Sequence, residues 1–495
     1  MMSNQSKRKH MNKRNFISIH PQLNCMLMLG ILIPVIYIAV DLLGLWNSIQ
    51  VIMLCLVMAA LVSGGFYFCQ KDFKSEVWVK YILFMGFVMR IGYMLYTPCT
   101  LRSHDLGKLS LQGNGHAAYI LNILQGHLPY TNAGQFYHPP LFYALSAAVI
   151  TVLKPVLKLS TEVEVVNCAR IVSCFFSCAT LCVVQRLCSQ LKVKKLWPLV
   201  LTAFLPNFYL MAGRVNNDAS VVFFMMVIML YSLKWAEEQS VKNTVVLALS
   251  FGLGMMSKLS AAVFAIPTGA MMFWVLYKNL KQKNSGNTIK SLILFGVISI
   301  PLGMAYPIRN LILFRQSFNY VLDLGGGIFA SENYTIVQRL LTFPIGKLFN
   351  PVYNNPYKDY NIWIYLIKGG LFGEFSFYVK SFMPLVMIMT FFIICLVMAA
   401  SFAWSICKRD SENTLLIMFS MTLMVSYIFF NIRYPYGCTM DFRYIVPVFI
   451  INVLLLGKNM ETLPYKKSYK LIHHGITSVT TVFSVLSVWM FCIIS

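Results

Sequence analysis

The segment that decides the fold occupies residues 98–143 and reads PCTLRSHDLGKLSLQGNGHAAYILNILQGHLPYTNAGQFYHPPLFY. It follows directly on an apolar run, yet it is rich in polar side chains, glycine-rich turns and a carboxylate at Asp105. Four of the eight histidines of the chain lie in it, and these are His104, His116, His127 and His138. A polar segment of this length beside a hydrophobic span is either a solvated loop or a site that faces a cavity. We predict a site.

The composition indicates a membrane protein. Hydrophobic residues make up 58% of the 495 residues and charged residues 12%, against roughly 25% charged in a soluble domain. Runs of about 20 apolar residues recur along the whole length, which predicts an all-α polytopic membrane protein. The formal net charge of +24 lies in short clusters between apolar runs. Such clusters are typical of cytoplasmic loops, so we expect no nucleic-acid partner.

The apolar runs predict about 13 transmembrane helices, near 25–46, 49–69, 77–96, 166–186, 196–213, 217–236, 243–257, 259–277, 289–307, 378–406, 413–431, 442–457 and 471–494. The basic clusters put the N-terminus in the cytoplasm and segment 98–143 on the exoplasmic side of the plasma membrane. Segment 139–156 is short and begins with two prolines, so we expect it to lie in the membrane interface or to dip into the membrane and return. We expect a helix at 117–127 to lie in the membrane plane. Placing the charged side chain of Arg90 in lipid would cost free energy, so it should face protein or a water-filled cavity.

This reading divides the chain into four parts. They are a basic cytoplasmic tail (1–24), a transmembrane core (25–307) that includes an outer loop (97–160), an exoplasmic cap (308–377) and C-terminal transmembrane helices (378–495). Because the cap segment is rich in Tyr, Asn and Gly, we expect it to be small and partly helical.

With this topology the unusual polar residues gather at the outer ends of several helices. We expect Asp105 and Asp218 to be catalytic. The expected substrate-binding residues are His104, His116, Tyr137, His138, Asn217, Lys258, Arg309, Arg433 and Arg443. Other roles stay open: Asp218 also suits a helix N-cap, Lys258 a tight turn with an outward lysine, and the two late arginines anchors at the membrane surface.

An acid beside cations in a lipid-accessible cavity suits the transfer of a group from a lipid phosphate. Asp105 would act as general base towards an acceptor hydroxyl, while arginine and lysine side chains would hold a polyprenyl phosphate as it leaves. A single displacement of this kind inverts the anomeric configuration. The sequence assigns no cofactor, but a divalent metal ion could help to bridge phosphate oxygens, with Asp105 and Asp218 as its candidate ligands. No histidine-based metal motif occurs in the loop.

Seven short motifs, taken in order, resemble the GT-C superfamily of integral-membrane glycosyltransferases. They are HD (104–105), GHAAYI (115–120), YHPPLFY (137–143), RVNND (214–218), MMSKLS (255–260), IRN (308–310) and DFRY (441–444). The resemblance covers about 80–450 and is greatest to bacterial relatives of the dolichyl-phosphate-mannose protein mannosyltransferases and of the aminoarabinose transferase that acts on lipid A. It implies transfer of a sugar from a polyprenyl-phosphate donor to a glycan, lipid or protein acceptor.

The resemblance also assigns roles to individual residues. The catalytic acid of the first outer loop falls on Asp105, the second exoplasmic acid on Asp218, and the residue that approaches the lipid phosphate on His138. The chain departs from the commonest family pattern at Leu106, where a second acid is usual, so a metal bound by that acidic pair is in question. The alternative is a polytopic transporter or a lipid-linked glycan flippase or polymerase, which would also need polar residues in a helical bundle.

Overall fold

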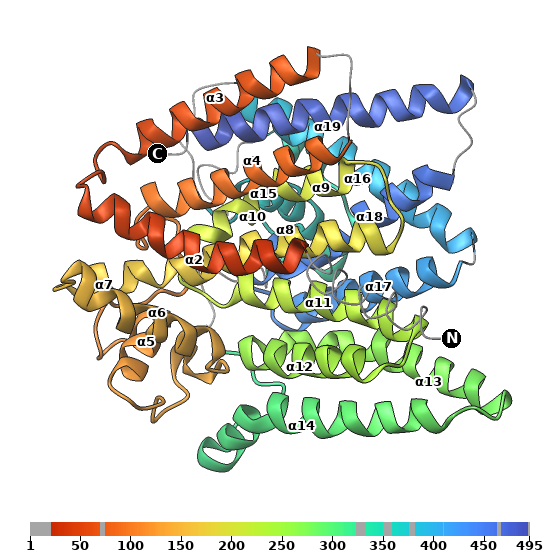
Figure 1. Ribbon diagram of the computed structural model, residues 1–495, viewed down its shortest axis with the longest axis horizontal. Helices are drawn as coiled ribbons and strands as arrows, with labels where there is room; N and C mark the ends of the chain where they lie inside the picture. Colours follow the sequence, from red (N-terminus) through yellow and green to blue (C-terminus); the bar gives the residue numbers. More distant parts are fainter. Residues whose placement is uncertain are drawn as a thin grey trace, which may run out of the picture.

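The structure is a bundle of helices. The computed structural model describes residues 21–69, 75–322, 333–349, 359–375, 382–408, 410–462 and 467–493, and all regular structure within these ranges is helical. Most of the expected cytoplasmic tail and parts of the expected cap lie outside them. Most helices run side by side along the longest dimension of the molecule (Figure 1). Among the described residues, 11 helices are long and apolar enough to cross a membrane. The all-α polytopic prediction is confirmed.

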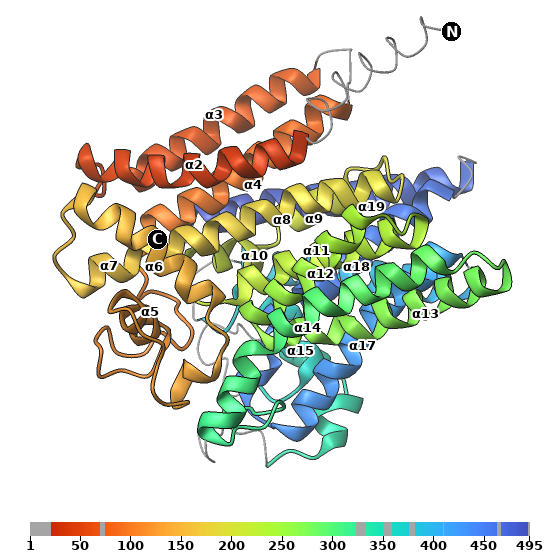
Figure 2. The ribbon, with the colours of Figure 1, turned by 60° about the horizontal axis from the view of Figure 1, so that its bottom comes forward.

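The long helices follow the apolar runs of the sequence. They are α2 (Pro21–Leu42), α3 (Ile49–Cys69), α4 (Ser75–Tyr96), α7 and α8 in continuation (Glu162–Cys168 and Arg170–Gln190), α11 (Asp218–Glu237), α13 (Ala265–Lys281), α14 (Gly286–Phe314), α16 (Met383–Cys407), α17 (Ser411–Arg433), α18 (Val446–Thr462) and α19 (Lys467–Ile493). Helix α8 packs against α2, α4 and α11 and is largely buried. Helices α2 and α3 lie on the outside of the bundle (Figure 2).

Two of the 13 expected spans take another form. The span near 243–257 is α12 (Val241–Ser257), an apolar helix of 17 residues. The span near 196–213 is broken into α9 (Trp197–Ala203), α10 (Pro206–Leu210) and the 3-10 turn η2 (Met211–Gly213). Pro206 has no N–H to continue the helix, and it holds Leu205 in an extended conformation with ψ of 114°. The break therefore follows from the proline.

Arg90 donates hydrogen bonds to backbone carbonyls at this break in the helix. Its side chain is fully buried, and its guanidinium donates to the carbonyls of Thr202, at 3.3 Å, and Ala203, at 2.8 Å. The Thr202 carbonyl would be bonded by residue 206 in an unbroken helix, where proline has no donor. Ser177 accepts a further hydrogen bond from Arg90 Nε at 2.9 Å. The expectation that Arg90 faces protein is confirmed, and its charge ties α4 to α8 and α9.

The segment that follows α4 lies at one end of the bundle. It contains α5 (His116–Leu124), the 3-10 turn η1 (Gly134–Tyr137) and α6 (Leu141–Leu157). Helices α5, α6 and α7 gather beside the ends of the long helices, at the left of Figures 1 and 2. Helix α6 packs against α5, α7 and α8, and it ends at Lys158, whose φ is +52°. A helix of 17 residues in this position is short for a membrane crossing.

The opposite end of the bundle carries basic connections. The connections α8–α9 and α13–α14 lie towards the right of Figure 1, away from α5. Lys192, Lys194 and Lys195 lie in the first of these connections and Lys283 in the second. Lysines between apolar helices are typical of cytoplasmic loops.

Part of the expected cap is packed inside the bundle. Helix α14 continues to Phe314, beyond the expected boundary at 307. Helix α15 (Ile362–Phe372) has nearly every residue buried and packs against α10 and α16. Its sequence, IWIYLIKGGLF, is apolar apart from Lys368, which pairs with Asp359 at 3.5 Å, and this composition suits burial on all sides. This helix carries the chain back towards the segment at 98–143.

Candidate active site

The loop after α4 is held in shape by close backbone contacts. The carbonyl of Asp105 accepts a hydrogen bond from the backbone N–H of His116 at 3.0 Å. Gly107 has a φ of +71°, and a Cβ at Gly115 would lie 2.3 Å from the carbonyl oxygen of Leu106. Only glycine allows this approach. Asp105 itself has a φ of +53°, and its side chain is 49% exposed. The loop thus presents the Asp105 carboxylate at the start of α5.

A buried ion pair joins two helix ends. Asp218 is the first residue of α11, where a negative charge interacts favourably with the helix dipole. Lys258 separates α12 from the 3-10 turn η3 (Leu259–Phe264), and its Nζ donates to Asp218 Oδ1 at 2.6 Å. Asn217 Nδ2 donates to the carbonyl of Ser257 at 2.8 Å and ties the same two ends together. Both charged side chains are largely buried.

Arg443 connects this pair with two further acids. It lies in the 3-10 turn η9 (Phe442–Ile445), which Asp441 caps by accepting a hydrogen bond from the Arg443 N–H at 2.9 Å. Its Nη2 is 3.9 Å from Asp105 Oδ2, its Nη1 is 3.6 Å from Asp218 Oδ2, and its Nε is 3.5 Å from Asp441 Oδ2. One guanidinium therefore joins acids that lie far apart in the sequence.

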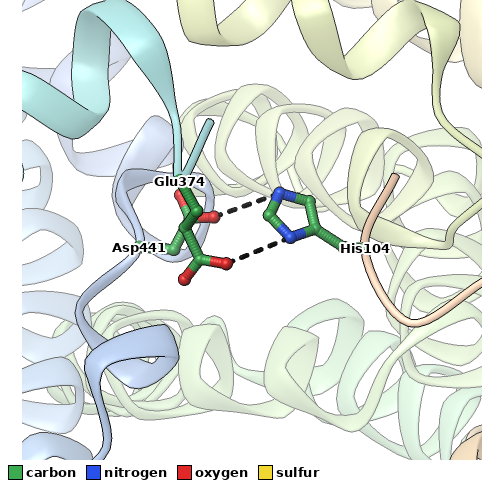
Figure 3. A group of neighbouring side chains, drawn as sticks. All are labelled: His104, Glu374 and Asp441. Carbon is green, nitrogen blue, oxygen red and sulfur yellow. Dashed lines mark ion pairs between the residues drawn. The ribbon is translucent and has the colours of Figure 1, made fainter. Parts of the chain in front are cut away.

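His104 lies between two acids (Figure 3). Its Nδ1 is 3.2 Å from Glu374 Oε2, and its Nε2 is 3.4 Å from Asp441 Oδ2. Burial and the nearby Arg443 guanidinium lower the pKa of His104, so its ring is neutral. Burial, together with the neighbouring Asp441, raises the pKa of Glu374 to about 8. At neutral pH Glu374 therefore holds a proton that it can share with the His104 ring.

The other two histidines of the site are neutral. Burial lowers the pKa of His116 to about 4, and it lowers the pKa of His138 well below its usual range. The rings of His116 and His138 stack with centroids 6.0 Å apart, and His116 Nδ1 lies 2.7 Å from the hydroxyl of Tyr143. Tyr137 packs against His138. These side chains offer hydrogen bonds to a ligand rather than charge.

The groups surround a cavity of about 700 Å³. Its polar wall contains nine of the expected site residues, together with Glu374 and Tyr444. The nine are His104, Asp105, His116, Tyr137, His138, Asn217, Asp218, Lys258 and Arg443. A second part of the wall is apolar and includes Val221, Val222, Met225, Val263, Leu423 and Pro447. The cavity can thus hold a ligand with an anionic head and an apolar body.

Two expected binding residues lie elsewhere. Arg309 donates to the carbonyl of Pro129 at 2.9 Å and to the Asn310 side chain at 2.9 Å, so it supports the outer loop from α14. Arg433 is exposed at the end of α17, against the ring of Tyr434. The structure does not bring either arginine to the cavity wall.

Three residues of the site were absent from the sequence-based selection. Glu374 and Asp441 flank His104, and Arg214 is buried nearby, with its guanidinium 4.7 Å from the ring centre of Phe375. Within the described part of the chain, none of the three Arg214 side-chain nitrogens has a hydrogen-bond partner. Arg214 begins the RVNND motif and Asp441 the DFRY motif, so both lay within reach of sequence reasoning. Glu374 stands alone after an apolar helix and gave no such signal.

One family resembles part of the chain. Residues 137–303 match the family described as dolichyl-phosphate-mannose-protein mannosyltransferase. The matched segment includes Tyr137, His138, Asp218 and Lys258 of the cavity wall. The match confirms the resemblance to the GT-C superfamily of membrane glycosyltransferases and supports the enzyme class. No curated protein sequence matches the chain significantly.

Two solved structures from Archaeoglobus fulgidus are similar over most of the chain. An oligosaccharyltransferase in the apo form has a TM-score of 0.43 and 11% identity, over 84% of this chain and 55% of its own. The oligosaccharyltransferase AglB, in complex with an inhibitory peptide and a dolichol-phosphate, has a TM-score of 0.46 and 9% identity, over 85% of this chain and 56% of its own. The chain thus spans just over half the length of these proteins.

Proposed function

We propose that the protein transfers a sugar from a polyprenyl-phosphate donor to an acceptor hydroxyl on the exoplasmic side of the membrane. The observation that carries this proposal is the convergence of Asp105, Lys258 and Arg443 on one cavity that also has an apolar wall. A lipid phosphate needs cations for its headgroup and an apolar surface for its chain. The family match over 137–303 supports the donor class.

Asp105 is the acid best suited to act as general base. Asp218 accepts a hydrogen bond from Lys258 at 2.6 Å and faces Arg443 at 3.6 Å, so its charge is already neutralised. Glu374 and Asp441 are buried against His104. Asp105 is half-exposed at the cavity and has a more distant ion-pair partner, Arg443 at 3.9 Å. It can therefore accept a proton from an incoming hydroxyl.

The reaction is a single displacement. The acceptor oxygen forms a bond to the anomeric carbon, its proton passes to Asp105, and the bond from the anomeric carbon to the phosphate oxygen breaks. The electron pair of that bond leaves on the phosphate, where Lys258 and Arg443 stabilise the growing charge. No acid needs to protonate the phosphate, so one free carboxylate is enough. Asp218 acts as a positioning residue that holds the two cations at the cavity wall.

The distribution of lysines supports the exoplasmic side. The cavity lies at the end of the bundle that carries α5. The connections at the other end carry lysines, as cytoplasmic loops do. This supports an exoplasmic site in the plasma membrane, where a glycan, a lipid or a protein would be the acceptor.

The test is a transfer assay with the purified full-length protein in lipid nanodiscs. Radiolabelled polyprenyl-phosphate sugars are combined with candidate acceptors, and wild type is compared with Asp105→Asn. We expect transfer to fall by at least about a hundredfold, the usual order for a missing general base, while donor binding stays within about twofold.

The matched control is Asp41→Asn. Asp41 lies at the end of α2 and accepts a hydrogen bond from Trp46, which asparagine can also accept. This variant should keep full transfer. Undiminished transfer by Asp105→Asn, with any donor that the wild type uses, would overturn the assignment of the base.

A further inference from the structure

His104, Glu374 and Asp441 form a group of metal-ligand type. They come from three distant parts of the chain: the loop after α4, the segment after α15 and the turn before η9. We propose that these three residues bind one divalent metal ion of the zinc or manganese class at the cavity wall. The binding of the ion stands apart from the proposed function, whereas its role towards a donor phosphate rests on it.

The distances allow a common ion. One ligand atom from each residue lies within 4.8 Å of the other two. Three points with this spacing have a centre no further than about 2.8 Å from each, and ligand bonds to zinc are about 2.0–2.2 Å long. A movement of about half an ångström per side chain would complete the site. One imidazole nitrogen and two carboxylate oxygens are donors that suit zinc and manganese.

Two buried atoms of the group lie 3.4 Å apart and make no hydrogen bond to any described residue. Among the described residues, neither His104 Nε2 nor Asp441 Oδ2 finds a hydrogen-bond partner, although Asp441 is fully buried and His104 is 7% exposed. Each such atom costs about 1–3 kcal/mol when its hydrogen bond is left unmade. All three residues point toward one another in Figure 3. A cation at their centre would satisfy both atoms at once.

The charges around the group leave room for a cation. Arg443 is the ion-pair partner of Asp441, but it also faces Asp105 and Asp218 within 3.9 Å. Its single positive charge is therefore shared among three acids. Glu374 has the His104 ring and the Tyr365 hydroxyl as partners, the latter donating at 3.3 Å, and both are neutral groups. Because ligands bind a metal ion in their deprotonated form, Glu374 would release its proton to solvent when the ion binds.

The site is open on the side where a phosphate would lie. His104 and Glu374 line the cavity, while Asp441 closes the group from behind. An ion held by three protein ligands keeps open positions for water or for phosphate oxygens. Because Arg443 also lines the cavity, the ion and the guanidinium would face the same phosphate group. The proposal differs from a metal held by Asp105 and Asp218, whose charges are engaged by Arg443 and Lys258.

The first test measures metal binding directly. The full-length protein is stripped with a chelator, and its binding of Mn²⁺ is followed by electron paramagnetic resonance, with Zn²⁺ as competitor. We expect about one ion per chain in wild type, and an affinity lower by at least about tenfold in Glu374→Gln and in Asp441→Asn, as loss of a ligand entails. Asp41→Asn is the matched control and should bind as wild type does. Absence of binding in wild type, or an affinity in both ligand variants equal to that of wild type, would overturn the proposal.

A second measurement needs no variant and guards against failure to fold. Pulsed spectroscopy of Mn²⁺ bound to wild type should reveal coupling to one imidazole nitrogen, from His104. Bound Mn²⁺ without nitrogen coupling would contradict the site. The transfer assay separates this proposal from the proposed function. If Mn²⁺ is bound through nitrogen but the protein transfers no sugar, the metal site is confirmed and the proposed function is wrong.

Discussion

The buried pair of Lys258 and Asp218 allows a quantitative prediction for Lys258→Met. At 2.6 Å and an effective dielectric constant of about 20, the attraction in this pair is about 6 kcal/mol before desolvation. Arg443, at 3.6 Å from the same carboxylate, supplies about 5 kcal/mol on the same scale. The second cation keeps Asp218 partly compensated after the substitution. We therefore expect Lys258→Met to lower the free energy of unfolding by about 3 kcal/mol, the lower end of the range for broken buried ion pairs.

The assay is unfolding of the purified protein in mixed micelles with increasing sodium dodecyl sulfate. Lys258→Met, Asp218→Asn and the double variant form a double-mutant cycle, in which the double variant should cost at least about 1 kcal/mol less than the sum of the two singles. Lys283→Met, at the basic end of the bundle, is the control and should stay within about 0.5 kcal/mol of wild type. Additive costs in the cycle would refute the view that the two residues stabilise the site as a pair.

Three further variants test other parts of the molecule. Gly115→Ala would bring a Cβ to 2.3 Å from a backbone carbonyl, so we expect a loss of about 3 kcal/mol in the same unfolding assay; a loss below about 1 kcal/mol would speak against the tight loop. The pKa of His116 is about 4 in the folded protein, below the unfolded value of about 6.5, so its contribution is present above about pH 6.5 and is lost as the pH falls towards about 4. Between about pH 7 and pH 5 wild type should lose about 2 kcal/mol more than His116→Gln, and equal acid sensitivity of the two would contradict this. Arg443→Gln should weaken donor binding at least about tenfold, while Arg433→Gln, outside the cavity, should leave donor binding unchanged. Equal effects of the two substitutions on donor binding would contradict binding of the donor in the cavity.

The membrane core could be predicted from sequence because apolar length is a local property. Arg90 illustrates this, since a charge within an apolar run has few places to go other than protein. The break at Pro206 was not predicted: the apolar run near 196–213 indicated one span, whereas the proline ends one helix and begins another. The boundary at 307 was less accurate, since α14 continues to Phe314 without a local signal to mark its end.

The site could be predicted in part, where polar residues stand out against apolar neighbours. Asp105, Asp218 and Lys258 each interrupt the pattern at the end of an apolar run, and the structure brings all three to one cavity. Glu374 shares no motif with His104, which lies far away in the sequence, and only the folded chain brings the two within 3.2 Å. Arg309 was predicted to bind substrate, but it donates a hydrogen bond to the carbonyl of Pro129 in the outer loop. Such a contact between distant parts of the chain cannot be recognised from the residues around Arg309.

The anomeric configuration of the product tests the central claim most directly. In a single turnover with the polyprenyl-phosphate donor that the protein uses, the transferred sugar should carry the configuration opposite to that of the donor, because Asp105 activates the acceptor for one displacement at the cavity. A product with the donor's configuration would require a second displacement through a carboxylate nucleophile. That result would contradict the role of Asp105 as general base.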